Sequence, residues 1–281
     1  MSDTSKEEAA GARATTAPVF PRGATRAFEF RVIAVWVTLF ALFVLLFSTF
    51  GLKFTFILEK LPALAGLKLT RDGFIQGAAL TLFVCFFSII ASSLLGLVSA
   101  LGRLSDSAVC YGISTFYTSF FRGTPLLVQI FLIYLGLPQL GPVPDAIPAG
   151  IIALSLNYGA YLSEIFRSGI MSVPICQREA GASLGLHKWV VFWTITLPQA
   201  TRIVIPPTGS QFIAMLKDSS LISVMGVWEI MFLAQSFGRS SYRYIEMLTT
   251  AATIYWILSI CFEIIQSRLE VKFGKGYSKA R

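Results

Sequence analysis

Side chains that could carry out catalysis are few in this chain. His187 is the single histidine, so a histidine metal cluster is excluded and a triad built on histidine is disfavoured. No two carboxylates share one helical turn within an apolar segment, so a buried acid–base pair is not supported. A phosphate-binding Gly-x-x-x-x-Gly-Lys-Ser/Thr loop is absent, since Gly274-Lys275-Gly276 lacks the upstream glycine and the hydroxyl residue. We therefore expect no enzyme activity, no metal and no cofactor, and any ATP chemistry would lie on another polypeptide.

Polar side chains within the apolar segments are the candidates for binding a solute, because such groups are costly in lipid and often mark a pathway. Asn157, Tyr158 and Tyr161 fall on one face of a predicted helix, and Gln129 and Gln211 lie in two other apolar segments. Amides and hydroxyls can bind both an ammonium and a carboxylate without a buried net charge. Hydrogen bonding between helices, worth about 0.6 kcal/mol per pair, is the alternative for each residue.

Charged residues flank these segments. Glu164 and Arg167 are three residues apart and are expected to form a local ion pair. Arg122 lies where the chain should break from an interfacial helix into a span, so a packing role is favoured over attraction of a solute carboxylate. Lys217 and Asp218 are expected to pair, with contact to an external protein as the alternative.

A polar loop at 174–198 separates two long apolar segments. Pro174 can begin a short helix, since its missing N–H is not needed in a first turn. Gly185 can adopt a positive φ and turn the chain back, and Pro198 then begins the next span. This pattern predicts a helix that lies against another protein, and a helix that only covers the bundle is the alternative. The candidate contact residues are Glu179, Ala180, Gly181, Gly185, Leu197 and Pro198.

The composition indicates that lipid surrounds the elements that position these residues. The 281 residues are 55% hydrophobic and 14% charged, with a mean hydropathy of +0.70, whereas soluble domains carry about 25% charged residues. A span needs roughly 20 apolar residues. The sequence therefore predicts an all-α polytopic membrane protein with about six spans, at 32–52, 74–101, 124–137, 149–166, 198–217 and 244–266.

The net charge of +8 arises mainly in the two tails and the 174–198 loop. Such a bias keeps these parts in the cytoplasm, so it predicts a cytoplasmic N-terminus rather than nucleic-acid binding. Residues 1–30 are expected to be a disordered tail, and 269–281 a basic one. The predicted outer connection after the first span is unusually basic, with Lys53, Lys60, Lys68 and Arg71. Residues 219–237 are expected to be re-entrant or to lie on the outer surface, with a seventh span as the alternative.

The loop from Glu179 to Pro198 resembles the EAA loop of the membrane subunits of ATP-binding-cassette (ABC) importers. The resemblance rests on Glu179-Ala180, on Gly185 six residues after Glu179, and on the closing Leu197-Pro198, with Ile195 also matching. Gly181 stands where that motif has a second alanine. The resemblance implies that a separate cytosolic ATPase binds this loop.

Three further segments, 121–129, 154–170 and 216–221, are similar to those of polar amino acid permeases, the histidine, glutamine, glutamate, arginine, cystine and opine importers. The similarity covers about 72–268, which implies a five-helix type I importer core preceded by an additional helix and outer loop at 31–71.

The family implies a subunit of the bacterial inner membrane that moves a polar amino acid by alternating access. Its implied partners are the cytosolic ATPase, an extracytoplasmic binding protein, a second permease subunit, identical or related, and the lipid bilayer. A secondary transporter or channel without an ATPase, and a non-transporting scaffold, are the alternatives. The identity of the amino acid stays open.

Overall fold

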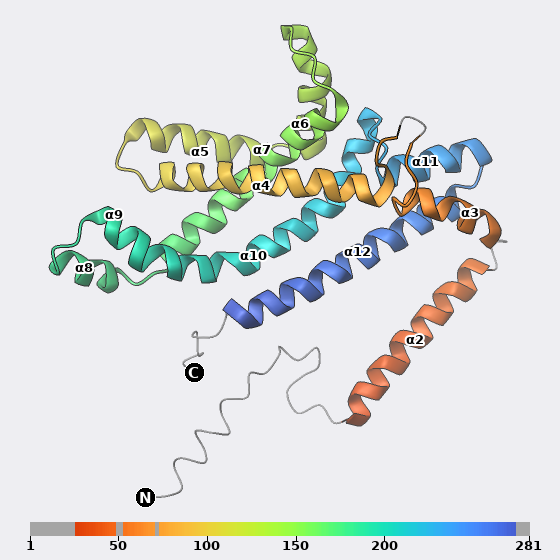
Figure 1. Cartoon of the computed structure of the whole chain (residues 1–281), viewed down its shortest axis with the longest axis horizontal. Helices are drawn as coiled ribbons and strands as arrows, with labels where there is room; N and C mark the ends of the chain where they lie inside the picture. Colours follow the sequence, from red (N-terminus) through yellow and green to blue (C-terminus); the bar gives the residue numbers. More distant parts are fainter. Residues whose placement is uncertain (1–25, 49–52, 71–72, 274–281) are drawn as a thin grey trace, which may run out of the picture.

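The computed structural model describes residues 26–48, 53–70 and 73–273, and every regular element within these ranges is helical (Figure 1). The all-α fold is therefore confirmed. The predicted tails lie largely outside the described residues, as does Arg71. The α-helices are α2 (Arg26–Ser48), α3 (Phe54–Leu64), α4 (Gly77–Arg103), α5 (Ala108–Gly123), α6 (Leu126–Phe131), α7 (Ala146–Met171), α8 (Ile175–Ser183), α9 (Lys188–Val191), α10 (Leu197–Asp218), α11 (Ile230–Ser241) and α12 (Tyr244–Phe273).

Within the described residues, α4, α7 and α12 are each long and apolar enough to cross a bilayer. Two bent pairs pass the same test when their halves are joined. These are Ala108–Gly123 with Leu126–Leu140, bent by 107°, and Lys188–Met225 with Ile230–Ser241, bent by 50°. In α2 the apolar stretch Phe30–Leu42 is shorter than a span. The described chain thus contains three to five candidate spans, and the count of six stays a prediction.

The helices α4 and α7 pack along each other because small residues line their shared face. A Cβ added at Gly96 would lie only 2.8 Å from a side-chain atom of α7. Hydroxyl groups cross the same contact, since Ser92 Oγ donates to the Ser155 carbonyl at 3.2 Å and Ser163 Oγ donates to Ser99 Oγ at 3.0 Å. Small residues and interhelical hydrogen bonds are the usual means of helix association in lipid.

The main hydrophobic core joins this pair to α6 and α10. Fully buried side chains from the four helices meet there, among them Val84, Ile130, Leu154, Met215 and Leu216. The core therefore fixes α7, which carries most of the candidate pathway residues, against α10.

Two π-helical turns, Leu132–Gly136 and Phe192–Thr196, each end two residues before a proline, Pro138 and Pro198. A proline lacks the N–H donor of the α-helical ladder, and in both places the widened turn directly precedes that gap. The helix of the fifth span was expected to begin at Pro198, which is wrong. It begins at Lys188 and passes through the π turn into α10.

The amphipathic segment expected to lie at the interface before the third span instead forms α5, which packs against α4 and α7 (Figure 1). Gly102 allows this approach, because a Cβ there would collide with Ser114 Oγ. The expected break near Thr124 is confirmed, since the chain bends by 107° between Gly123 and Leu126.

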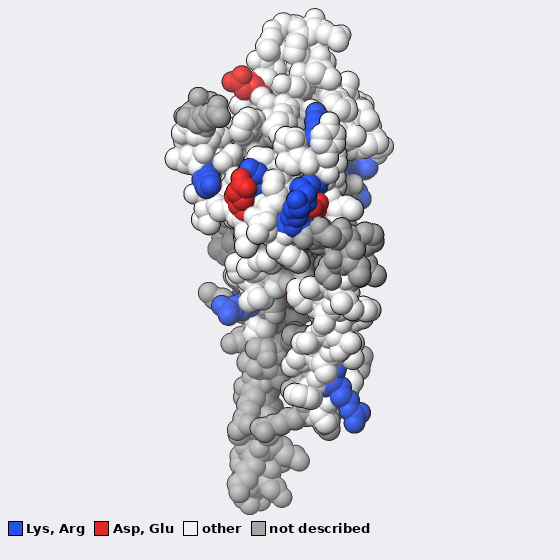
Figure 2. All heavy atoms as spheres, turned by 90° about the vertical axis from the view of Figure 1, so that its right-hand side faces the viewer, with Lys and Arg blue, Asp and Glu red and all other residues white. Residues whose placement is uncertain are grey.

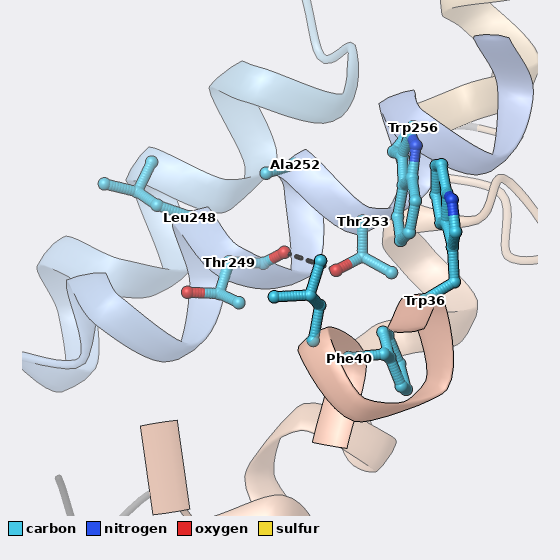
Figure 3. Close-up of a pocket in the computed structure, with 8 residues that line it drawn as sticks. Trp36, Phe40, Leu248, Thr249, Ala252, Thr253 and Trp256 are labelled. Atoms are coloured by element: carbon cyan, nitrogen blue, oxygen red, sulfur yellow. Dashed lines mark hydrogen bonds between the residues drawn. The ribbon is translucent and has the colours of Figure 1, made fainter. Parts of the chain in front are cut away.

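The helix α2 stands apart from the others (Figure 1). A groove of about 680 Å³ separates it from α12. Trp36 and Phe40 form one wall, and Thr253 and Trp256 form the other (Figure 3).

The two ends of the long axis carry different elements (Figure 1). The short helices α8 and α9 lie at one end, whereas α3 and α11 lie at the other. The helices α4 and α10 run most of the way between the two ends.

Candidate functional site

The loop at 174–198 folds as a short helix that ends in a Schellman motif. Pro174 occupies the N-cap position and α8 begins at Ile175. At its other end Gly185 has φ +76°, as expected from the sequence. Its N–H bonds to the Ala182 carbonyl at 2.9 Å, and the Leu186 N–H bonds to the Gly181 carbonyl at 3.2 Å. These two bonds define the motif, which favours glycine at the left-handed position.

Gly181 has a packing reason to differ from alanine. It is the buried residue of α8, and a Cβ there would lie 2.9 Å from Val191 Cγ2 and 3.0 Å from Ile195 Cδ1. The absent methyl group therefore lets α8 lie directly on the helix that follows it. Ile195, matched in the loop motif, thus serves as part of the surface that receives α8.

This end exposes large apolar side chains together with the charged residues Arg178, Glu179 and Lys188. Leu184, Trp189 and Trp193 are 80%, 63% and 60% exposed. Glu179 is also exposed, and its carboxylate makes no ion pair with any residue in the described ranges. His187 caps α9, since its Nδ1 accepts from the Trp189 N–H at 3.4 Å. An exposed apolar patch with polar neighbours is typical of a protein-binding surface.

Leu197 and Pro198 lie in the first turn of α10, directly after the π turn, and Ala180 lies exposed on α8. Gln199 joins the two helices of the loop, because its Nε2 donates to Gln177 Oε1 at 2.5 Å and to the Ile195 carbonyl at 2.9 Å. The structure therefore gathers all the predicted contact residues into one unit, α8 to the start of α10.

The structure brings Asn157 and Gln129 together at the bend between α5 and α6. Asn157 Nδ2 donates to Gln129 Oε1 and to the Phe121 carbonyl, both at 3.1 Å. Gln129 Nε2 donates to the same carbonyl at 2.9 Å and to Thr124 Oγ1 at 2.8 Å. Both amides are buried, so they satisfy backbone groups that the break leaves without helical partners.

Tyr158 and Tyr161 have different surroundings, although they share a face of α7. Tyr158 is buried, and its hydroxyl donates to Asp218 Oδ2 at 2.7 Å. Tyr161 is 37% exposed, and its ring lies 5.4 Å from the Arg122 guanidinium. The expected Lys217–Asp218 ion pair does not form between these described residues, since no contact within 4 Å joins them.

Gln211 is partly buried on α10, seven residues before Asp218. Residues seven apart lie close to the same face of a helix. Gln211 therefore lies on the face of α10 that carries the hydrogen bond to Tyr158, about two turns nearer α8.

Glu164 is the centre of a larger ion cluster than expected. The predicted pair with Arg167 is confirmed at 3.0 Å, and Arg103 and Arg122 also contact the carboxylate, at 2.6 Å and 3.0 Å. Arg103 Nε is buried without a hydrogen-bond partner in the described chain. Three arginines against one glutamate leave an excess of positive charge beside Tyr161.

Sequence reasoning missed Glu229, which is fully buried. Its carboxylate caps α11 by accepting from the Met231 N–H at 2.9 Å and the Phe232 N–H at 2.7 Å, and it also accepts from the Tyr255 hydroxyl at 2.5 Å. Glutamate is not among the residues usually favoured at an N-cap, so its position before an apolar helical run carried no clear capping signal. The partner on α12 lies 26 residues away, and no local pattern indicates it.

Comparison with known proteins agrees with this geometry. The family model described as "Binding-protein-dependent transport system inner membrane component" matches residues 92–275, which include α8, α10 and the Glu164 cluster. The chain belongs to this family. It is thus a membrane component of a transport system. The apolar helices α4, α7 and α12, which are long enough to cross a bilayer, agree with this role.

Several relatives of this inner membrane component are themselves permeases. This chain is 41% identical over 206 residues to the probable amino-acid permease protein YxeN of Bacillus subtilis. The aligned region covers 72% of this chain and 92% of the relative. The chain is 37% identical over 199 residues to the arginine transport system permease protein ArtQ of the same organism, covering 70% and 91%.

A solved structure described as an amino acid ABC transporter with histidines has a TM-score of 0.71 and 33% identity to this inner membrane component. The match covers 79% of this chain and 99% of that one. The family is one of transport subunits rather than enzymes, as expected from the sequence.

Proposed function

We propose that this chain is the translocation subunit of an ATP-driven importer of a polar amino acid. The observation that carries the proposal is the α8 unit, a short helix closed by Gly185 that presents an exposed apolar face at one end of the molecule. The permease names of its relatives support an amino acid as the solute.

The α8 unit is proposed to bind a separate cytosolic ATPase through Glu179, Ala180 and the exposed tryptophans. Gly181 and Gln199 fix α8 to the start of the next helix. A movement of the ATPase would therefore be transmitted to α10 and, through the shared core, to α7. Packed helices of this kind can carry coupling between distant sites.

The pathway is proposed to follow the facing sides of α7 and α10, with Tyr161 and Gln211 in contact with the solute. Tyr161 is partly exposed and stands beside Arg122, whose partner Glu164 is shared with two other arginines. The positive excess suits the carboxylate of an amino acid. Asn157, Gln129 and Tyr158 would instead shape the wall, because their polar groups are already bonded within the protein.

The remaining partners and the orientation are proposed from the family. The α8 end would face the cytoplasm and the α3–α11 end would face outward, with the N-terminus inside. A second permease subunit, identical or related, would complete the pathway, and an extracytoplasmic binding protein would deliver the solute. The family description names an inner membrane, and we propose that it is the inner membrane of a bacterium.

Replacing Gly185 tests the coupling role. A Cβ at Gly185 would meet no atom within 4 Å, and Asn and Asp both tolerate a positive φ. Gly185→Asp should therefore insert and fold, but its charge would enter the partner interface and reduce uptake of labelled amino acids at least about tenfold, which corresponds to about 1.4 kcal/mol. Uptake is measured in cells lacking this permease, after restoring it.

Gly185→Asn is the matched control, because it has the same shape and backbone preference without the charge. It should retain most of the uptake and should copurify with the ATPase. Normal uptake by a properly inserted Gly185→Asp protein would contradict the coupling role of the loop. Uptake without any bound ATPase would contradict the proposed function itself.

A further inference from the structure

A cavity lies between α10 and α12, beside the contact that joins the two helices. The helices pack against each other and run in opposite directions (Figure 1). They approach closely at Gly209, where an added Cβ would lie 3.1 Å from Gln266 Cγ. Gln266 Nε2 donates to Ser210 Oγ at 2.7 Å and fastens the same contact. The cavity, of about 430 Å³, therefore lies next to a fixed point of the helix pair.

The shape and lining of this cavity fit a hydrocarbon chain. The side chains that line it are apolar except at Thr208 and Gln266. On α10 the lining runs from Val204 to Ile213, nine residues farther along, which is about 13 Å of helix. One leaflet accounts for half of a hydrocarbon core about 30 Å thick. The cavity is thus nearly as long as the acyl chain of one leaflet.

The cavity is closed at its end away from α8 and accessible beside α12. The rings of Phe212 and Phe262, whose centroids lie 4.8 Å apart, line the far end. Ile265 and Leu269 line the part nearer α8 and are 50% and 38% exposed. An apolar chain can therefore enter between the two helices from the side.

Arg202 carries a positive charge on the cavity side of α10. It lies seven residues before Gly209, and residues seven apart lie close to the same face of a helix. Its side chain is exposed and forms no ion pair with any residue that the structure describes. At the end opposite α8, by contrast, acidic and basic side chains lie next to one another, as Glu59 and Lys60 do (Figure 2). Arg202 thus lacks the counter-charge that basic residues find elsewhere.

The depth of Arg202 in the membrane suits a phospholipid headgroup. The helix α10 ends at Asp218, sixteen residues or about 24 Å beyond Arg202. That length is most of a hydrocarbon core of about 30 Å, so Arg202 lies near the boundary on the α8 side. An arginine there extends its charged group toward the headgroups, since charge is costly among the acyl chains. Phosphate oxygens are favourable partners for a guanidinium.

We propose that the cavity between α10 and α12 holds one acyl chain of an anionic phospholipid from the leaflet on the α8 side, with Arg202 bound to its phosphate. The cavity begins on the same face of α10 as Arg202 and extends from there toward the middle of the bilayer, as the acyl chain of such a lipid does. Basic groups between membrane helices are typical binding sites for anionic headgroups. The inference goes beyond the proposed function and depends on neither the solute nor the ATPase.

The bound lipid would support α10 where its backbone is weakest. Pro206 and Pro207 lie inside this helix at the level of the cavity, and each removes a donor from the helical hydrogen bonds. An acyl chain packed beside them would resist bending at this point. Because α10 continues from the helix that receives α8, the lipid would stabilise the segment that positions the α8 unit.

The test measures lipid binding to the detergent-purified transport complex by native mass spectrometry. Phosphatidylglycerol is the probe, and phosphatidylcholine is the comparison without net charge. Arg202→Gln should raise the apparent Kd for phosphatidylglycerol about fivefold, the contribution of about one arginine near an anionic lipid surface, and should affect phosphatidylcholine less. Arg268→Gln is the matched control, because Arg268 is an exposed basic residue of α12 that does not line the cavity. It should leave both Kd values unchanged.

Ile265→Phe tests the part of the site that binds the acyl chain. Its ring would fill part of the cavity and should weaken binding of both lipids about tenfold, which is the loss of about two buried methylene groups. Ile264→Phe is the matched control, since Ile264 is equally exposed on α12 and does not line the cavity. Phosphatidylglycerol should raise the unfolding midpoint of the wild type and of both controls more than that of Arg202→Gln or Ile265→Phe, because a ligand stabilises the folded state that binds it.

Four results would overturn the site. The first is unchanged lipid binding in both Arg202→Gln and Ile265→Phe. The second is equal weakening by Arg202→Gln and Arg268→Gln, which would show a general attraction of anionic lipid. Displacement of phosphatidylglycerol by free inorganic phosphate would replace the lipid by a soluble anion. Binding to the isolated chain that disappears in the complete complex would show that another subunit covers the cavity. None of these results bears on import, which the uptake of the Gly185 variants tests separately.

Discussion

At the scale of single residues, the hydrogen bonds separate the candidate pathway side chains into two groups. Asn157, Gln129 and Tyr158 direct their polar groups at backbone or at Asp218 within the protein. Tyr161 keeps more than a third of its surface exposed. The residue types in the sequence do not distinguish these groups, because both consist of amides and phenols on one helical face. The distinction depends on where the chain bends.

Asn157→Leu should therefore lower the stability of the protein more than it changes the selectivity for the solute. The substitution leaves Gln129 Oε1 without its donor, and an unsatisfied buried group costs about 1–3 kcal/mol. We expect a lower midpoint of thermal unfolding in detergent and reduced uptake, with ATPase binding retained.

Tyr161→Leu is the matched comparison on the same helix. It removes the partly exposed ring and should weaken the apparent affinity for the transported amino acid, while the unfolding midpoint changes little. Two results together would instead place Asn157 in contact with the solute. Asn157→Leu would alter solute preference at an unchanged unfolding midpoint, and Tyr161→Leu would change neither the apparent affinity nor the midpoint.

At the scale of elements, the apolar segments and the Gly and Pro positions were sufficient to predict the all-α class and the α8 loop, but not α3, which forms in the segment expected to be an outer loop. Positive φ at Gly185 follows from local geometry, so it could be predicted. The contacts of Glu164 with Arg103 and Arg122 join three helices, so sequence spacing gives no sign of them. The placement of α5 along α4 and α7 was missed, because it depends on the small side chains of partners far along the chain.

The fit of α8 on the following helix gives a prediction of its own. Gly181→Val should crowd Val191 and Ile195, and overpacking of this kind typically costs about 1–3 kcal/mol. The unfolding midpoint should fall and the ATPase should copurify less well. Gly112→Val is the control, because a Cβ at this helical glycine meets nothing within 4 Å. Equal effects in the two variants would show that helix propensity, not packing, is responsible.

At the scale of the whole molecule, the two ends of the long axis are built from different elements. The α8 end exposes Leu184 and two tryptophans together with Arg178 and Lys188, whereas the α3–α11 end exposes Tyr242 and three basic residues together with Leu58 and Leu67. Two such surfaces agree with a protein that has a different partner on each side of the membrane. The family match explains the fold that separates the two surfaces.

The orientation can be measured with thiol labelling. Cys176 is an exposed cysteine in α8, so a variant that keeps it alone should react with a membrane-impermeant maleimide in inside-out vesicles and not in intact cells. A variant whose sole cysteine is introduced by Tyr242→Cys should show the reverse pattern. Labelling of both variants from the same side would contradict the orientation.

The π-helical turn Phe192–Thr196 has a mechanical consequence. A π turn contains one residue more than an α turn, and one residue of an α-helix corresponds to about 100° of rotation and about 1.5 Å of rise. Moving that extra residue along the helix would swing the attached α8 around the axis of α10 without unfolding either helix. The turn at Leu132–Gly136 gives the segment that follows α6 the same freedom. The chain thus contains two points at which a helix can rotate without unfolding.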